Sequence, residues 1–188
     1  MVAQAGKAPE TIAVIDTETQ QRRSGEVVGS VEKYVGDPCD CHACQGHGLV
    51  FGAVAQLKLP PASRSSADYA EAIRCAGAEG FGVLIVDSLS HEWESCKAEV
   101  DRLAEGKYRG NKWAAWSEVT GGHDQVIQAL LDFPGHVIAC CRGKEKSEQE
   151  GQGKGAKIRS RGLLPLQREQ IEFEFDVWMN MTKASAVV

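Results

Sequence analysis

The chain has 188 residues, of which 43% are hydrophobic and 25% charged, and its formal net charge at pH 7 is −5. This composition is ordinary for a globular protein, and no apolar run approaches the ~20 residues of a membrane span. The N-terminal stretch "MVAQAGKAPE" lacks the apolar core of a signal peptide, so we expect a cytoplasmic protein without membrane association. The length predicts a single domain over residues 1–188.

The net charge conceals an uneven distribution along the chain. Eight Lys and Arg but only three Glu lie between Arg142 and Arg168, so this stretch carries +5 and the remainder −10. A basic stretch on an acidic body is typical of a local phosphate-binding element. The alternative is a solvated loop whose charges have no binding role.

The first predicted element is a buried strand over residues 11–16, within "TIAVIDTET". Its residues are β-branched or apolar, and it ends on Asp16, with Glu18 two residues further on. A second strand is expected within residues 50–59, where two prolines stop it. The acidic ending of the first strand makes it a candidate for a site.

A cysteine- and histidine-rich insertion is expected at residues 37–48. It contains four candidate zinc ligands: Cys39, Cys41, Cys44 and His47. Thiolate and imidazole are ligands that Zn²⁺ prefers, but the usual second pair of ligands is missing, so a surface insertion with free thiols is the alternative. Because no secretion signal is present, the seven cysteines are interpreted as reduced thiols or metal ligands rather than as disulfides.

A helix capped by Ser65 or Ser66 is expected next, and it leads into a strand over residues 83–87. That strand reads "VLIVD", so it ends on Asp87, which Ser88 follows. Asp at the end of a buried strand, followed by Ser, fits a Walker-B element, in which the carboxylate holds Mg²⁺. The alternative is that Asp87 caps the helix that follows.

Two helical patterns come after this strand. In the first, "HEWESCKAEVDRLAEG", we expect His91 to be a solvated residue of the first turn. The alternative is that His91 contacts a nucleotide or its γ-phosphate. The second, "KWAAWSEVTGGHDQVIQALLDF", is expected to break near Gly121 and Gly122, and His123 is expected to pack in the core.

The last part of the chain is predicted to begin with a short strand at residues 136–140. A flexible basic loop is expected over residues 143–162, which are rich in glycine and nearly lack large apolar side chains. The alternation in "IEFEF" predicts a half-exposed strand at residues 171–175. Strands that alternate with helices predict an α/β fold with a largely parallel sheet flanked by helices.

In such sheets ligands bind at the carboxyl ends of the strands, where Asp16, Glu18 and Asp87 would gather. The order of the segments also resembles a known family from about residue 8 to residue 182, apart from the insertion. Its most specific motifs are "VLIVDSLSHEW" and "PLQREQIEFEFDV". On these motifs the chain resembles the phage-type ATPases with a RecA-like P-loop NTPase core, some of which act in single-strand annealing and DNA recombination.

The resemblance implies roles for individual residues. Glu18 would activate the water that attacks the γ-phosphate of ATP, and Asp87 would hold Mg²⁺. Ser88, Arg142 and Lys144 would bind the nucleotide phosphates. The basic loop would contact single-stranded DNA through four side chains: Lys154, Lys157, Arg159 and Arg161. The family also implies a homo-oligomer, either a ring or a filament.

One motif of that family is not found in this sequence. A P-loop ATPase uses G-x-x-x-x-G-K-[ST] to cradle the phosphates, and Gly6-Lys7 lacks the required spacing. In the family this motif precedes the first strand, so we expect the N-terminal strand and P-loop to lie upstream of Met1, or ATP hydrolysis to have been lost. The sequence therefore predicts an ATP-dependent recombination or annealing protein. The alternative is a non-hydrolysing DNA-binding or zinc-containing accessory protein.

Overall fold

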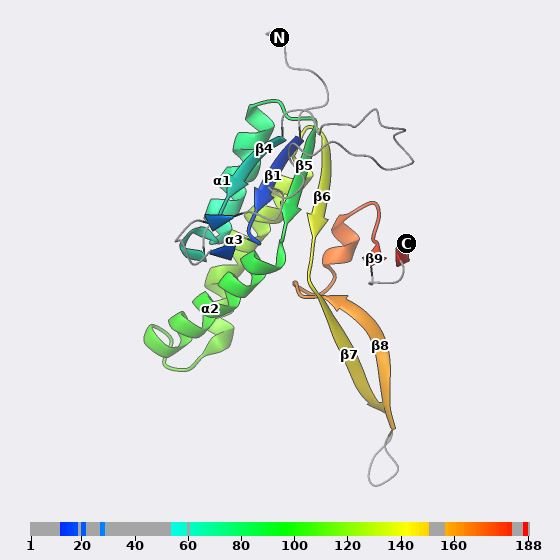
Figure 1. Ribbon diagram of the computed structural model, residues 1–188. Coiled ribbons are helices and arrows are strands. Elements are labelled where there is room, and N and C mark those ends of the chain that lie inside the picture. The colour runs from blue at the N-terminus through cyan, green and yellow to red at the C-terminus, as the bar shows by residue number, and fades with distance from the viewer. Residues whose placement is uncertain are drawn as a thin grey trace. The chain divides into compact units, whose positions relative to one another are not determined.

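A computed structural model describes residues 12–18, 20–21, 27–28, 54–59, 61–150, 157–181 and 186–187. The chain divides into two compact units, Met1–Cys140 and Cys141–Val188, which are described in turn (Figure 1). The single domain expected over residues 1–188 stays a prediction. Within the described residues, no helix is both long enough and apolar enough to cross a membrane.

The first unit is built on a four-stranded sheet with the strand order β4-β1-β5-β6. Its strands are β1 (Ile12–Asp16), β4 (Val54–Lys58), β5 (Val83–Asp87) and β6 (His136–Cys140). All three pairings are parallel, so the four carboxyl ends lie at one edge of the sheet (Figure 1). A short antiparallel pair follows β1 in the chain, β2 (Gln20–Gln21) and β3 (Val27–Val28). The predicted parallel sheet is confirmed.

The two central strands form the core because their residues are apolar. Val14 and Ile15 of β1 are almost completely buried, and Leu84 and Val86 of β5 are completely buried. Burying an apolar side chain of this size stabilises the fold by ~1.5–3 kcal/mol. The edge strand β6 instead alternates between exposed and half-buried residues. The residues that follow β1 and β5 are therefore held by the most buried part of the sheet.

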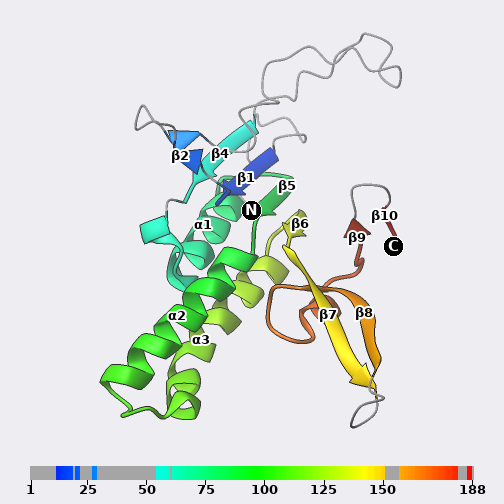
Figure 2. The same cartoon turned by 60° about the horizontal axis from the view of Figure 1, so that its bottom comes forward.

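Three helices complete the first unit (Figure 2): α1 (Ser66–Ala78), α2 (Ser90–Gly106) and α3 (Lys112–Leu131). α3 packs against both α1 and α2. α1 begins with a capping box, in which Ser65 Oγ accepts the N–H of Asp68 at 3.2 Å and Asp68 Oδ2 accepts the N–H of Ser65 at 2.9 Å. The predicted helix start at Ser65 or Ser66 is confirmed.

α3 runs without interruption through Gly121 and Gly122, so the break predicted there is wrong. Gly122 allows a close approach of two helices, because a Cβ atom at this position would lie 3.3 Å from Cβ of Ser66 in α1. A glycine inside a helix costs about 1 kcal/mol relative to alanine, which packing between helices can offset.

The second unit is built on an antiparallel hairpin of β7 (Gly143–Glu150) and β8 (Lys157–Pro165). At the open end of the hairpin, Leu166 N–H donates to the carbonyl of Arg142 at 2.7 Å. The 3₁₀ helix η4 (Ile171–Glu174) follows. A pair of short antiparallel strands comes last, β9 (Asn180–Met181) and β10 (Ala186–Val187).

Two predictions for this unit are wrong. The flexible loop expected over residues 143–162 is a hairpin wherever the structure describes it, because the backbone ladder orders the strands without large apolar side chains. The half-exposed strand expected at residues 171–175 is a 3₁₀ helix over most of its length. Gln170 has a φ of 72°, which breaks the extended backbone just before this segment, and only Ile171 of the 3₁₀ helix is buried.

Candidate functional site

The carboxyl ends of β1 and β5 bring the predicted acidic residues together. The parallel register places Asp16 beside Asp87, and Thr17 N–H donates to the carbonyl of Asp87 at 2.6 Å. Asp16 is fully buried, and its Oδ1 accepts the N–H of Glu18 at 2.9 Å. The side chain of Glu18 is 29% exposed, and Asp87 is half-buried. The edge of the sheet therefore presents two carboxylates that solvent can reach, above one that is completely buried.

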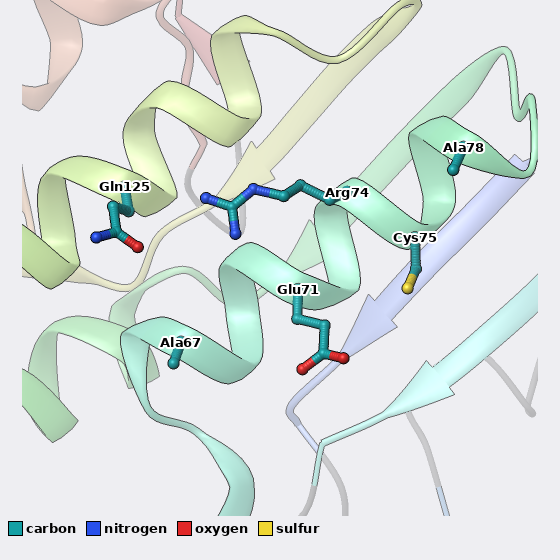
Figure 3. A pocket seen from close by; sticks show the side chains of 6 residues that line it. All are labelled: Ala67, Glu71, Arg74, Cys75, Ala78 and Gln125. Atoms are coloured by element: carbon teal, nitrogen blue, oxygen red, sulfur yellow. The ribbon is translucent and has the colours of Figure 1, made fainter.

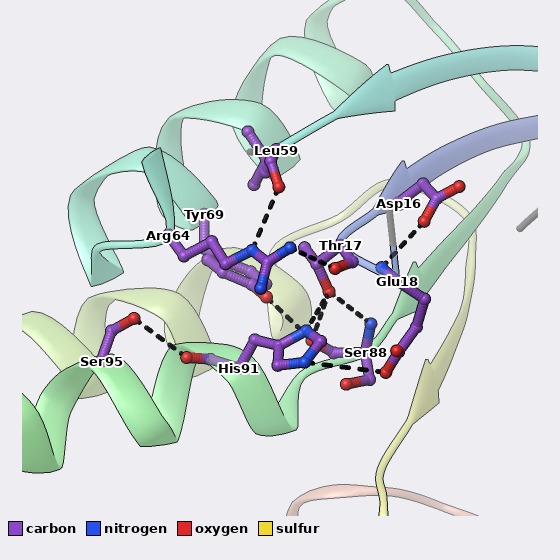
Figure 4. A network of polar contacts seen from close by, with 9 residues as sticks. All are labelled: Asp16, Thr17, Glu18, Leu59, Arg64, Tyr69, Ser88, His91 and Ser95. Atoms are coloured by element: carbon purple, nitrogen blue, oxygen red, sulfur yellow. Dashed lines mark hydrogen bonds and ion pairs between the residues drawn. The ribbon is translucent and has the colours of Figure 1, made fainter. Parts of the chain in front are cut away.

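Thr17 connects the two strand ends (Figure 4). Its Oγ1 accepts the N–H of Ser88 at 2.7 Å and donates to the carbonyl of Ser88 at 3.1 Å. The same oxygen lies 2.8 Å from Nδ1 of His91, in the first turn of α2. Thr17 and Ser88 are both buried, so water cannot readily replace these bonds. The Thr17 hydroxyl thus fixes the backbone after β5 relative to the backbone after β1.

Two further side chains support this connection (Figure 4). Tyr69 on α1 donates its hydroxyl proton to the carbonyl of Ser88 at 2.8 Å, and burial raises the pKa of Tyr69 so that the hydroxyl stays a donor. Arg64 donates to the carbonyl of Thr17 and, at 3.1 Å, to the carbonyl of Leu59 just after β4. The ends of three neighbouring strands are therefore held by side-chain hydrogen bonds.

His91 connects this network to Glu18. Its Nδ1 faces Thr17, and its Nε2 lies 3.8 Å from Oε1 of Glu18 (Figure 4). His91 is only 6% exposed, so the prediction that it is solvated is wrong. The physical reason is that α2 begins at Ser90, three residues after β5 ends, and its first turn therefore lies against the end of β1. The imidazole therefore lies between the Thr17 hydroxyl and the Glu18 carboxylate.

Asp87 and Ser88 occupy the position expected of a Walker-B element. The N-cap residue of α2 is Leu89, which makes no side-chain capping bond. The peptide bond between Asp87 and Ser88 is cis. Among the described residues, Ser88 Oγ is buried and has no hydrogen-bond partner. Buried hydroxyl groups in native proteins are generally paired, so this oxygen fits a site that binds a polar ligand.

Several predicted site residues belong to the second unit or lie outside the described residues. Arg142 and Lys144 belong to the second unit, where both are exposed and Lys144 is paired with Leu164 in the hairpin. Three of the predicted DNA contacts are residues of β8: Lys157, Arg159 and Arg161. The remaining candidates, like the whole 37–48 insertion, lie outside the described residues: Cys39, Cys41, Cys44, His47 and Lys154.

A second polar cluster is buried between the three helices. Glu92 of α2 has one carboxylate oxygen 3.0 Å from Nδ1 of His123 in α3. Its other oxygen accepts bonds from Ser66 Oγ at 2.6 Å and from Cys96 Sγ at 3.0 Å. Burial alone would raise the pKa of Glu92, but the interactions with His123, Ser66 and Cys96 outweigh it and hold this pKa below its ordinary value. The core of the first unit therefore contains a carboxylate anion.

A surface groove of about 470 Å³ runs along α1 and α3 (Figure 3). Its lining residues are Ala67, Glu71, Arg74, Cys75, Ala78 and Gln125. All of them come from helices, and none comes from the carboxyl end of a strand. The groove is therefore distinct from the cluster of acidic residues.

Three side chains of the strand-end network were not predicted from the sequence: Thr17, Arg64 and Tyr69. For His91 the sequence left a contact with the nucleotide as the alternative to a solvated position. Thr17 stands between Asp16 and Glu18, so its place in the strand-end motif was an available signal. No motif surrounds Arg64, and the sequence pattern indicates only that Tyr69 is on a buried helix face.

Comparison with known families agrees with this geometry. The family model for the AAA domain matches residues 49–186, which is more than half of the chain. The matched region contains β4, β5, β6 and all three helices, and so includes the Asp87–Ser88 strand end. No curated protein and no solved structure matches the sequence. The chain therefore belongs to the AAA domain family and is a nucleotide-binding domain of the AAA type.

Proposed function

We propose that a nucleoside triphosphate and Mg²⁺ bind at the carboxyl ends of β1 and β5, and that the chain acts in ATP-dependent DNA recombination or single-strand annealing. The observation that carries the nucleotide site is the convergence of Glu18, Asp87 and the unpaired Ser88 hydroxyl at one edge of the sheet. Ligands of α/β proteins bind at this edge, and the AAA family match supports a nucleotide as the ligand.

The donor set fits a magnesium ion and a phosphate. Asp87 offers a half-buried carboxylate, a hard oxygen ligand of the kind that Mg²⁺ prefers. Ser88 Oγ offers a hydroxyl that can donate to a phosphate oxygen, or accept from a water bound to the ion. When bound, Mg²⁺ neutralises negative charge on the phosphate oxygens. Asp87 would therefore hold the ion, and Ser88 would bind beside it.

Glu18 is assigned the role of orienting the attacking water. A carboxylate that accepts a hydrogen bond from water directs the lone pair of that water away from itself, toward the phosphorus. The Glu18 backbone is fixed by its bond to Asp16, and its side chain lies near His91. His91 would act as a positioning residue, because its contact with buried Thr17 restricts where its ring, and hence Glu18, can lie.

The nucleic-acid part of the proposal rests on the charge of the β7–β8 hairpin. The stretch from Arg142 to Arg168 carries +5, within a chain of net charge −5. The backbone register pairs Arg159 with Glu148 and Lys157 with Glu150. A ring or filament of several copies would place several such hairpins along one strand of DNA.

The test of the nucleotide site is the affinity for a fluorescent ATP analogue, measured with Mg²⁺ and again with a chelator. We expect Mg²⁺ to increase the affinity for the analogue. In Asp87→Asn this Mg²⁺-dependent increase should be smaller by about tenfold or more, which corresponds to about 1.4 kcal/mol. Glu18→Gln should bind like the unaltered chain, because its role is to orient water. Asp101→Asn is the matched control, since Asp101 is an exposed residue paired with Lys112. Equal Mg²⁺ dependence in Asp87→Asn and Asp101→Asn would contradict the proposed site.

The DNA-binding role predicts a change in salt dependence. Replacing Lys154, Lys157, Arg159 and Arg161 by Ala should weaken binding of single-stranded DNA to a similar extent for every sequence. The slope of log K against log[salt] should become shallower by about 0.7 for each phosphate that the variant no longer neutralises. Fluorescence anisotropy at several salt concentrations measures both quantities. The control replaces four basic residues outside the hairpin by Ala: Arg74, Lys97, Arg102 and Lys112. Unchanged affinity and slope in the hairpin variant would show that the DNA site lies elsewhere.

One observation favours the second candidate, a DNA-binding accessory protein that does not hydrolyse ATP. The 188 residues contain no G-x-x-x-x-G-K-[ST]. Phosphate release in the presence of Mg²⁺ and single-stranded DNA separates the two candidates. Turnover near the ~1 s⁻¹ scale of phosphoryl-transfer enzymes would support hydrolysis by this chain, whereas DNA binding without turnover would support the accessory role.

A further inference from the structure

The buried cluster of Glu92, Cys96 and His123 has the chemistry of a metal centre. One carboxylate oxygen, one sulfur and one imidazole nitrogen all lie within 4.8 Å of one another. Glu92 and Cys96 lie four residues apart on one face of α2, and His123 reaches them from α3. Ser66 Oγ on α1 lies 2.6 Å from a Glu92 oxygen and 3.2 Å from Cys96 Sγ, so it offers a fourth donor.

The buried carboxylate of Glu92 would also be stabilised by a cation. Glu92 is fully buried, and an isolated buried carboxylate is strongly unfavourable unless a positive charge compensates it. Among the described residues, the side chains that contact this carboxylate are Ser66, Cys96 and His123, and none of them carries a fixed positive charge. A divalent ion bound between the three ligands would supply the compensating charge.

We propose that Glu92, Cys96 and His123 form a buried binding site for Zn²⁺, with Ser66 Oγ as the fourth ligand. The bound ion would link α1, α2 and α3. Sulfur, nitrogen and carboxylate oxygen are the three ligand types of tetrahedral zinc sites, and contacts of about 2.0–2.3 Å would require only small side-chain shifts from the present spacing. Its ligands are different residues from those of the Cys39–His47 cluster and from those of the proposed nucleotide site.

Binding includes a proton balance that can be measured. A cysteine binds zinc as the thiolate, so the Cys96 thiol must lose its proton when the ion binds. Zinc binding forms one Zn–S bond, breaks one S–H bond and releases that proton to solvent. Affinity should therefore increase with pH, and about one proton should be released per ion from this thiol.

The test uses a variant in which Cys96 is the single remaining cysteine. The other six cysteines are replaced by Ser: Cys39, Cys41, Cys44, Cys75, Cys140 and Cys141. Of these, Cys75 and Cys140 are exposed and Cys141 is only partly buried, so the replacements spare the core wherever the structure describes them. After removal of metal, this variant should bind one equivalent of Zn²⁺. With Co²⁺ it should show a thiolate-to-cobalt charge-transfer band.

Two further variants complete the experiment. Replacing Cys96 by Ser in the same background should abolish the charge-transfer band and lower the zinc content at least tenfold. His136→Ala is the matched control and should leave both unchanged, because His136 is exposed on the edge strand β6. The proposal is overturned if the Cys96-only protein retains no zinc, if Co²⁺ gives no thiolate band, or if zinc binding survives the loss of Cys96. If the Cys96→Ser protein does not fold, the spectrum of the Cys96-only protein decides alone.

Discussion

Replacing His123 by Ala is expected to lower the free energy of unfolding of the first unit by about 3–5 kcal/mol. The reason is that Glu92 and His123 are both buried, so the truncation leaves a carboxylate in the core without its principal partner. Ser66 and Cys96 would still donate to one oxygen of Glu92, but the other oxygen would lose its contact with the imidazole. A cavity next to the Trp93 ring, 5.1 Å from His123, adds to the destabilisation.

Chemical denaturation followed by tryptophan fluorescence measures this change, in the presence of a chelator so that metal does not contribute. Trp178 should first be replaced by Phe, since Trp93, Trp113 and Trp116 then report on the first unit alone. His123→Asn should recover part of the stability, because its amide can donate to Glu92 from near the position of Nδ1. The control His136→Ala should change stability by less than about 0.5 kcal/mol. A decrease below 1 kcal/mol in His123→Ala would show that the contact between Glu92 and His123 does not stabilise the core.

Replacing Thr17 by Val is expected to cost about 2–4 kcal/mol, although the two side chains have nearly the same shape. Valine leaves Ser88 N–H without its acceptor at 2.7 Å and removes the hydroxyl that His91 Nδ1 faces at 2.8 Å. Each buried polar group left unpaired costs about 1–3 kcal/mol. The same change should also loosen the position of Glu18, because the His91 ring is then no longer fixed by the Thr17 hydroxyl.

Thr120→Val is the matched control for this substitution. Thr120 Oγ1 donates only to the carbonyl of Trp116, one turn earlier in α3, and this carbonyl remains available to the helix. We expect a change of less than about 1 kcal/mol at Thr120. Equal decreases in stability at Thr17 and Thr120, in thermal or chemical unfolding, would show that the Thr17 network does not hold the strand ends together.

The strand ends could be predicted from the sequence because two signals coincide there. Apolar runs identify β1 and β5, and each run ends on an Asp. Parallel pairing then requires Asp16 and Asp87 to lie at the same edge of the sheet, and the register places them opposite one another. Hydrophobic patterning and the geometry of parallel sheets therefore sufficed to predict that Asp16 and Asp87 lie at the same edge of the sheet.

The supporting network could not be predicted in the same way. Thr17 and His91 are 74 residues apart, and their contact depends on how closely α2 follows β5. A histidine in a first helical turn is usually solvated, and only the tertiary structure shows that this one is buried. The pairing of Glu92 with His123 likewise depends on the packing of α2 against α3, which hydrophobic periodicity indicates only in outline.

The hairpin was missed for a different reason. Large apolar side chains are the main signal of a buried strand, and β7 has none. The order of β7 comes from its backbone pairing with β8. Three of the glycines that suggested a flexible loop come between the two strands in the sequence: Gly151, Gly153 and Gly155. Polar hairpins of this kind satisfy their backbone hydrogen bonds without a core, so composition alone does not distinguish them from loops.

The most direct test of the nucleotide site replaces Mg²⁺ by Mn²⁺, whose electron paramagnetic resonance signal measures the free ion. With a non-hydrolysable ATP analogue present, we expect one Mn²⁺ to bind per chain, together with the nucleotide. Asp87→Asn should weaken this binding by about tenfold or more, whereas Asp101→Asn should leave it unchanged. Equal Mn²⁺ binding in the two variants, or no Mn²⁺ bound beyond that held by the free nucleotide, would contradict a magnesium–nucleotide site at the ends of β1 and β5.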